Sequence, residues 1–379
     1  MKTTVLLARV TRLASVGLFL GLLVSCSGGP EKHRPAELAP NSSLLGVRLG
    51  WTSKVGVVDF PLDVKVVGNT IAIASSDGVV ASLDAGTGAE LWRTQVGSQI
   101  AAGVGSDGRY AAVVTRGNEL ITLDAGREIW RQKITAQSFT APLVAGGRVF
   151  LLAADRSVIA FDGLSGRKLW TQQRPSESLV LRQQGVLLAV GDTLVAGLSG
   201  RLVGLNPING SIRWESAIAS PRGTNDIERL VDLVGRVSRD GDIVCARAFQ
   251  SAVGCVNVAR GSLLWAKPAY GSLGVDGDEK FIFGVEGDGK LVAWRRGDGE
   301  RAWASERLLY RNLTSPLVVG RSVAVGDEAG LVHWFSREDG AALTRVATDG
   351  SAIVAAPVLA AGTLVVVTHS GGVFGFKPE

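Results

Sequence analysis

From about residue 47 to the C-terminus the chain repeats one short pattern, and this repeat constrains the fold more than any other feature. Its clearest copy runs from Ala141 to Trp170 and reads APLVAGGRVFLLAADRSVIAFDGLSGRKLW. The copy contains four short apolar segments that are separated by Gly- or Asp-containing turns, and the fourth segment ends in tryptophan. Such short, β-branched segments predict β-strands rather than pairs of helices.

The end of each copy recurs at regular intervals. The expected ends of the fourth strands are Trp51, Trp92, Trp130, Trp170, Trp214, Trp265, Trp303 and Thr344. Neighbouring ends lie between 38 residues (Trp92 to Trp130) and 51 residues (Trp214 to Trp265) apart. A period of about 40 to 50 residues is typical of the four-stranded blade of a β-propeller. The sequence therefore predicts an all-β fold built from antiparallel blades.

The two ends of the repeat region complement one another. The strand that ends at Trp51 has no three strands before it, whereas residues 351–376 supply three strands and no fourth. We therefore expect the N-terminal strand to complete the C-terminal blade and to close an eight-bladed ring; a miscounted blade would make it seven. Closure leaves no long open sheet edge, and a closed ring predicts a monomer.

The repeated tryptophans are expected to pack between neighbouring blades, where an indole buries a large apolar area. Thr344 takes the place of this tryptophan in one blade and predicts a looser contact there. Asp84, Asp124 and Asp162 precede Gly turns and are expected to form turns rather than to act in catalysis.

The N-terminus has the layout of a secretory signal peptide. Lys2, Arg9 and Arg12 precede an apolar stretch over residues 13–24 that is too short for an ordinary membrane span. The stretch ends in Leu-Val-Ser-Cys26, which resembles a bacterial lipobox; an ordinary signal peptide with an incidental cysteine is the alternative. The lipobox resemblance implies that residues 1–25 are removed and that Cys26 carries S-diacylglycerol and N-acyl lipid. Ser27 then favours the outer membrane, with the protein facing the periplasm.

Residues 26–46 are expected to be the lipidated cysteine and a flexible tether, because Pro30, Pro35 and Pro40 interrupt a polar, Gly-containing run. Residues 47–379 are then one propeller domain.

Charge and composition exclude several functions. The chain has 40 basic and 35 acidic residues, and removal of the three basic residues of the signal peptide leaves a formal net charge of +2. Such a balance predicts no nucleic-acid surface. The three histidines are scattered, so we expect no metal site, and no catalytic motif or cofactor-binding loop is present.

Two cysteines remain beside Cys26. Cys245 and Cys255 lie on the expected second and third strands of one blade, with the turn near Gln250, so they could face each other across the hairpin. An oxidising compartment permits a structural disulfide, and a free buried pair is the alternative.

The blades resemble those of pyrroloquinoline-quinone-dependent dehydrogenases, which would make the protein an enzyme. That resemblance implies adjacent cysteines, a calcium site and long pocket-forming insertions. This chain has no adjacent cysteines, and its loops are short.

The lipobox, tether and eight-bladed propeller are together similar to the BamB family of the outer-membrane β-barrel assembly machinery. Two stretches carry the resemblance: Ser178-Leu-Val-Leu-Arg182, and Arg222-Gly-Thr-Asn-Asp-Ile-Glu-Arg-Leu-Val-Asp232. The resemblance implies that Leu179, Leu181, Arg182 and Asp232 dock on the POTRA domains of BamA. Val234 stands where the family has a second acidic residue, so the charged part of that interface is expected to differ.

The positions of these stretches agree with one surface. Arg182 and Asp232 each lie ten residues before the Asp of a Gly-Asp turn, at matching places in adjacent blades. Leu179 and Leu181, two residues apart, point the same way if the chain is extended. The alternative is that both leucines are core and that Arg182 pairs with Asp232.

The resemblance implies a non-enzymatic scaffold of the assembly complex, which could also hold unfolded outer-membrane proteins at its strand edges. Another alternative is a periplasmic propeller that binds peptidoglycan or another partner through Trp294 and Trp334, although these third-strand residues could equally be core.

Overall fold

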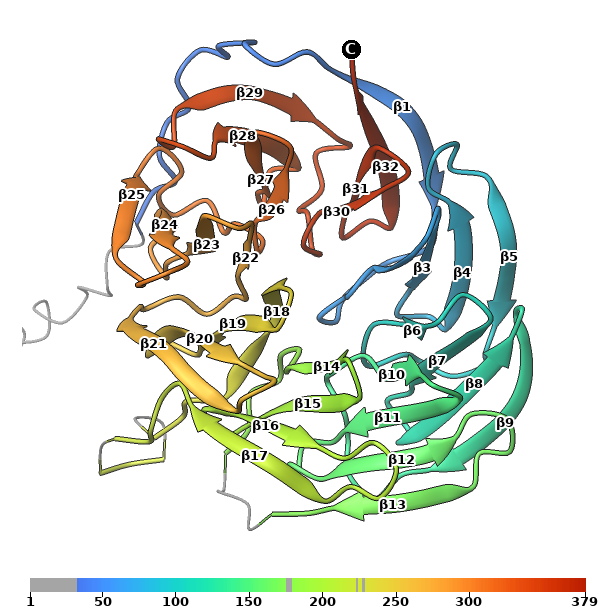
Figure 1. Cartoon of the computed structure of the whole chain (residues 1–379). Helices are drawn as coiled ribbons and strands as arrows, with labels where there is room; N and C mark the ends of the chain where they lie inside the picture. The colour runs from blue at the N-terminus through green and yellow to red at the C-terminus, as the bar shows by residue number, and fades with distance from the viewer. Residues whose placement is uncertain (1–32, 175–178, 223, 227–228) are drawn as a thin grey trace, which may run out of the picture. The chain divides into compact units, whose positions relative to one another are not determined.

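The computed structural model of the chain describes residues 33–174, 179–222, 224–226 and 229–379, and its compact unit spans Ala36–Glu379. The signal peptide and Cys26 lie outside the described residues. The compact unit is a ring of eight four-stranded antiparallel sheets (Figure 1). The described residues contain no helix, and hence none that could span a membrane.

The first four blades follow one another along the chain. Blade 1 comprises β2 (Lys65–Val67), β3 (Thr70–Ala74), β4 (Val79–Asp84) and β5 (Glu90–Gln95). Blade 2 comprises β6 (Gly105–Ser106), β7 (Tyr110–Val114), β8 (Glu119–Asp124) and β9 (Arg127–Lys133). Blade 3 comprises β10 (Leu143–Ala145), β11 (Arg148–Leu152), β12 (Val158–Asp162) and β13 (Lys168–Gln172). Blade 4 comprises β14 (Leu187–Val190), β15 (Thr193–Leu198), β16 (Arg201–Leu205) and β17 (Ile212–Ala217).

The other four blades complete the ring. Blade 5 comprises β18 (Leu233–Asp240), β19 (Ile243–Ala248), β20 (Ala252–Asn257) and β21 (Ser262–Pro268). Blade 6 comprises β22 (Asp276–Gly277), β23 (Phe281–Val285), β24 (Leu291–Arg295) and β25 (Arg301–Ser305). Blade 7 comprises β26 (Leu317–Val319), β27 (Ser322–Gly326), β28 (Leu331–Ser336) and β29 (Ala342–Ala347). Blade 8 comprises β30 (Val358–Ala360), β31 (Thr363–Val367), β32 (Gly372–Pro378) and, from the other end of the chain, β1 (Val47–Lys54).

The predicted closure is confirmed by the pairing of β1 with β32. The register runs from Val47 opposite Pro378 to Lys54 opposite Gly372. Both middle strands of each blade are buried on both faces, because each blade packs against two neighbours, and this explains their continuous apolar runs.

The repeated tryptophans join successive blades. Trp51 of blade 8 donates its indole N–H to the carbonyl of Ala85 in blade 1 over 3.0 Å. Its ring lies against Gly88, which has φ +74°, and a Cβ there would meet the ring at 2.4 Å. The turn thus needs glycine both for its left-handed backbone and for the close approach of the indole. Equivalent contacts join Trp92, Trp130, Trp170, Trp214, Trp265 and Trp303 to Gly126, Gly166, Gly210, Gly261, Gly299 and Gly340.

Thr344 stands at the one blade interface where that turn cannot exist. Blade 8 has no turn between its third and fourth strands, because β32 and β1 are opposite ends of the chain. Thr344 pairs instead with Trp334 on the third strand, and the Trp334 ring packs edge to face on Phe376 of blade 8. The bulky side chain at this interface therefore comes from the third strand rather than from position 344.

Residues 36–46, called here the N-terminal strap, run along the outside of blade 7 before entering β1 (Figure 1). The Ala36 amide donates to the Leu309 carbonyl (2.9 Å), and the Leu44 amide donates to the Leu343 carbonyl (2.7 Å). The folded unit therefore begins at Ala36, which shortens the expected tether by the length of the strap.

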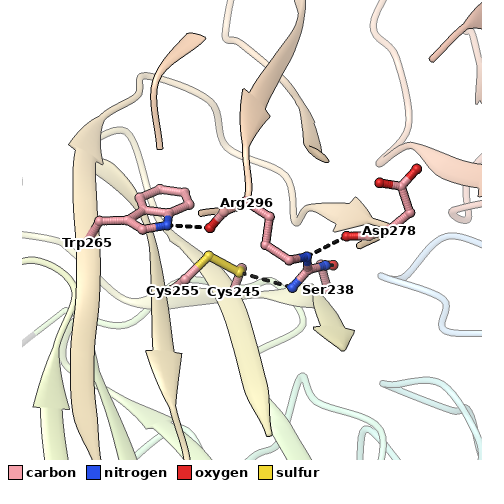
Figure 2. The surroundings of a disulfide bond; sticks show 6 residues. All are labelled: Ser238, Cys245, Cys255, Trp265, Asp278 and Arg296. Carbon is pink, nitrogen blue, oxygen red and sulfur yellow. Dashed lines mark hydrogen bonds between the residues drawn. A yellow bond between two sulfur atoms is a disulfide. The ribbon is translucent and has the colours of Figure 1, made fainter. Parts of the chain in front are cut away.

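Cys245 and Cys255 lie opposite each other on β19 and β20 and are joined by a disulfide (Figure 2). The Arg296 side chain from blade 6 reaches across this bond: its guanidinium contacts Cys245 Sγ at 3.5 Å and bonds to Ser238 Oγ. The Arg296 carbonyl accepts the Trp265 indole N–H at 2.7 Å. The disulfide is thus part of the contact between blades 5 and 6.

Candidate functional site

Two long connections between blades lie side by side on one face of the ring. The first links β13 to β14 and is described at residues 173–174 and from Leu179 onward; the second links β17 to β18 and ends at Asp232. The start of β18, directly after the second connection, pairs with the end of the first: the Gly235 amide donates to the Gln184 carbonyl (2.8 Å), and Val234 forms a bridge with Gly185. Ser178, Gly223, Ile227 and Glu228 of the two sequence stretches lie outside the described residues.

A buried ion pair fixes the two connections to the turn between β11 and β12. Arg156 in this turn is only 5% exposed, and its Nη2 donates to Asp232 Oδ1 and to the Leu179 carbonyl, each at 3.1 Å. The Leu181 amide donates to Asp232 Oδ2 at 3.4 Å. The Asp232 carboxylate therefore holds the Leu179–Leu181 segment in place from behind.

Arg156 occupies a backbone position that four other blades give to glycine and that blade 2 gives to Asn118. Its φ is +61°, and its amide donates to the carbonyl three residues earlier. Four other blades form the same turn with a glycine of positive φ: Gly78, Gly289, Gly330 and Gly371. An arginine with a left-handed backbone conformation is less stable than a glycine in the same conformation. The contacts of the Arg156 side chain are expected to offset this cost. This substitution in the repeat is the signal by which the sequence could have revealed Arg156.

The surface that these contacts present is apolar with a cationic edge. Leu179 is 40% exposed, and Leu181 is half-buried in a small pocket that Phe139, Arg156 and Asp232 also line. The exposed Arg182 guanidinium lies 5.5 Å from the centre of the Phe139 ring, a cation–π contact.

Leu179, Leu181, Arg182 and Asp232 therefore lie close together, but the contacts that hold them there differ from those expected. Asp232 pairs with Arg156, not with Arg182, so the alternative of a simple Arg182–Asp232 pair is wrong. Leu179 is not a core residue either. Sequence reasoning missed Arg156 and Phe139, which lie on an earlier blade and far from both motifs.

Val234 is buried in β18 at the bridge with Gly185. A carboxylate at this position would lose its hydration, whereas valine fills the same space without that cost. Nearby, burial raises the pKa of Asp63, against the opposing effect of Arg236 and Lys65. In the described part of the second connection, Asp232 is the acidic residue that contacts the Leu179–Leu181 segment, through the Leu181 amide.

Other chemistry has little support in this structure. Within the described ranges no group of three or more His, Cys, Asp or Glu residues is placed to hold a metal ion. Trp294 and Trp334 are both buried, so neither presents an indole face to a sugar.

Known proteins resemble this chain over most of its length. Residues 76–305 match the family model described as "Outer membrane protein assembly factor BamB". Assembly factor BamB of Burkholderia pseudomallei is 35% identical over 363 residues (94% of this chain, 95% of the relative), and that of Bordetella pertussis is 33% identical over 349 residues (91% and 90%).

The fold has a solved counterpart as well. The crystal structure of BamB from Moraxella catarrhalis superposes with a TM-score of 0.80 at 23% identity, covering 87% of this chain and 99% of the other. The length and identity of the sequence matches, rather than the shared propeller, decide the assignment. The chain belongs to the BamB family of outer membrane protein assembly factors.

Proposed function

We propose that this propeller is a non-enzymatic scaffold of the outer-membrane β-barrel assembly complex, and that it docks on the POTRA domains of BamA. Its family membership supports a role in outer-membrane protein assembly. A rigid ring contributes to such a complex by holding a partner's domains in a fixed arrangement, with no bond made or broken.

One observation carries the docking surface. Leu179 and Arg182 are exposed on a segment that the buried Arg156–Asp232 pair holds from behind. Interfaces concentrate their binding energy in a few apolar and arginine side chains on a pre-organised surface. In this proposal Leu179, Leu181 and Arg182 contact BamA, whereas Asp232 and Arg156 position them.

The test is affinity purification of the assembly complex from membranes. We compare the natural chain with a Leu179→Ala, Leu181→Ala, Arg182→Ala variant of verified folding. Leu359→Ala is the matched control, because Leu359 is exposed to a similar extent, 42%, on β30 of another blade. Loss of BamA from the triple variant alone supports the proposal. Equal recovery by all three proteins moves the interface elsewhere, and no recovery by the natural chain refutes the scaffold role.

The proposed location is the periplasmic side of the outer membrane, with lipid on Cys26. Each buried CH2 of an acyl chain contributes about 0.8 kcal/mol to membrane attachment, so two or three chains anchor the protein firmly. A Cys26→Ala variant should lose incorporation of radiolabelled palmitate and leave the membrane fraction. Retention of both by this variant would refute the anchor.

A second role, holding unfolded outer-membrane proteins, is supported by apolar side chains on the outermost strands. Leu91 on β5, Ile129 on β9, Ile212 on β17 and Leu263 on β21 are all exposed. A strand edge with apolar side chains can add an extended chain. A pull-down with unfolded porin that shows no propeller-dependent retention would remove this role.

A further inference from the structure

A groove of about 590 Å³ opens between blades 5 and 6, away from the docking face residues described above. Its apolar floor is the small exposed part of Val292 and Trp294 of β24, which are only 3% and 5% exposed. Its rim carries Tyr270, which is 68% exposed, and Arg301 of β25. A groove with an apolar floor and a polar rim suits an elongated ligand with at least one apolar group.

The next interface along the ring has the same groove. Trp294 and Arg301, which line the groove between blades 5 and 6, are cross-strand partners in blade 6. Phe335 and Ala342 are the corresponding partners in blade 7 and line the groove between blades 6 and 7. Each pair comes immediately after the pair that contains Trp303 or Thr344, so the two grooves occupy equivalent places.

The second groove is covered by the protein's own N-terminal strap. Residues 37–42 form one of its walls, and only about 150 Å³ remain open beside them. The Leu38 side chain packs on an apolar cluster that includes Leu308 and Phe335. The structure therefore contains an example of what such an inter-blade groove accepts.

The strap is held mainly through its backbone. Arg311 donates to the Ala36 carbonyl (3.1 Å) and Arg345 donates to the Ala39 carbonyl (3.3 Å). The Asn41 side chain donates in turn to the Arg345 carbonyl at 2.9 Å. Backbone hydrogen bonds and one partly buried leucine do not depend on a particular sequence, so a different extended chain can satisfy an equivalent groove.

Charge around the open groove is balanced. The lining contains three cationic and three anionic side chains: Lys267, Lys290, Arg301, Glu286, Asp288 and Glu300. Lys267 pairs with Glu300, and Lys290 lies 3.0 Å from Glu306. A balanced rim does not favour an anion or a strongly charged peptide, and it suits an uncharged segment.

We propose that the groove between blades 5 and 6 binds an extended, uncharged segment of another polypeptide, with an apolar side chain beside Tyr270 and against the small exposed parts of Trp294 and Val292. This site is separate from the Leu179–Arg182 surface and does not depend on docking to BamA. The bound segment takes the place that the strap holds one blade further on.

The test uses the purified full-length protein and a fluorescent peptide of residues 36–46, blocked at both ends, with Glu37→Gln to remove its charge. Fluorescence anisotropy should show saturable binding with one peptide per protein. A Tyr270→Ala, Arg301→Ala variant should bind at least tenfold more weakly. Ile208→Ala is the matched control, because Ile208 is also 68% exposed but lies far along the chain in blade 4, and it should bind normally.

A second variant tests the equivalence of the two grooves. Leu38→Asp should release the strap, because a carboxylate cannot remain in the Leu308–Phe335 cluster, and the number of bound peptides should rise from one to two. Absence of saturable binding by the intact protein, or equal affinity of the rim variant and the Ile208 control, would overturn the proposal. So would sedimentation as a dimer that the peptide dissociates, since the occupant would then be the strap of a second copy.

Discussion

At the residue scale, the docking surface depends on a largely buried charge pair, with the Arg156 side chain 6% and the Asp232 side chain 15% exposed. Asp232 divides its carboxylate between the Arg156 guanidinium and the Leu181 amide, so it orders the apolar segment in front of it. A buried pair of this kind contributes little net stability while intact, but removal of one partner leaves the other desolvated and unpaired.

Asp232→Asn should therefore lower the free energy of unfolding by about 1–3 kcal/mol, because Arg156 loses its counter-ion in a buried position. Urea denaturation measures this difference. Asp192→Asn is the control: Asp192 also pairs with an arginine, Arg213, but its side chain is 84% exposed, so we expect a change below about 1 kcal/mol. Equal losses in the two variants would contradict the positioning role.

The pair of Trp334 and Thr344 reverses a rule that the other blades follow. Elsewhere a small or medium-sized third-strand residue faces the fourth-strand tryptophan, for example Gly204 opposite Trp214 or Ala293 opposite Trp303. In blade 7 the tryptophan is on the third strand instead. The exchange follows from ring closure, because blade 8 offers no turn glycine on which a tryptophan at position 344 could rest.

Trp334→Ala should cost about 3–5 kcal/mol by leaving a cavity against Phe376. The exchanged variant Trp334→Thr, Thr344→Trp restores the total volume but should remain clearly less stable than the natural chain. Thermal unfolding followed by tryptophan fluorescence tests both. Full recovery in the exchanged variant would show that the missing turn does not explain the reversal.

At the element scale, the disulfide ties the middle strands of blade 5 across ten residues of sequence. Closing so short a loop in the unfolded chain restricts it by about 2–3 kcal/mol. The Cys245→Ala, Cys255→Ala variant should lose roughly this amount in guanidinium denaturation. Reductant should destabilise the natural chain and leave the variant unchanged; an equal response of both would contradict the assignment.

The repeat made most elements predictable and also hid the exceptions to it. Each fourth strand could be located because Trp must lie opposite a turn glycine of the next blade, as Trp51 does with Gly88. The N-terminal strap could not be located, because Leu38 is one apolar residue in a polar, Pro-containing run and has no counterpart in any other blade. The partner of Arg156 was hidden for a different reason: the contact between Arg156 and Asp232 spans 76 residues of sequence.

At the scale of the whole molecule, closure depends on the last strand. β32 pairs with β1, and the Trp51 ring packs against Gly375 within this pair. A chain that ends at Gly371 should leave β1 without a partner and should open the ring between blades 7 and 1. We expect a larger radius by small-angle X-ray scattering and rapid proteolysis near residue 50.

Removal of Pro378 and Glu379 alone is the control, because it shortens the β1–β32 ladder only at its end, opposite Val47. That variant should keep the radius and cooperative unfolding of the natural chain. If the chain ending at Gly371 behaved like this control, the β1–β32 pair would not be what closes the ring.

The same closure sets an order of events in biosynthesis. β1 precedes all the other strands in the chain, but it pairs only with β32, which is synthesised after the other seven blades. The other seven blades consist of consecutive strands and can form before β32 is made, whereas the ring closes only when β32 pairs with β1. A product that stops before β32 therefore keeps an incomplete blade with unpaired strand edges, which favour aggregation and proteolysis. Closure of the ring is in this way possible only for a chain that contains both β1 and β32.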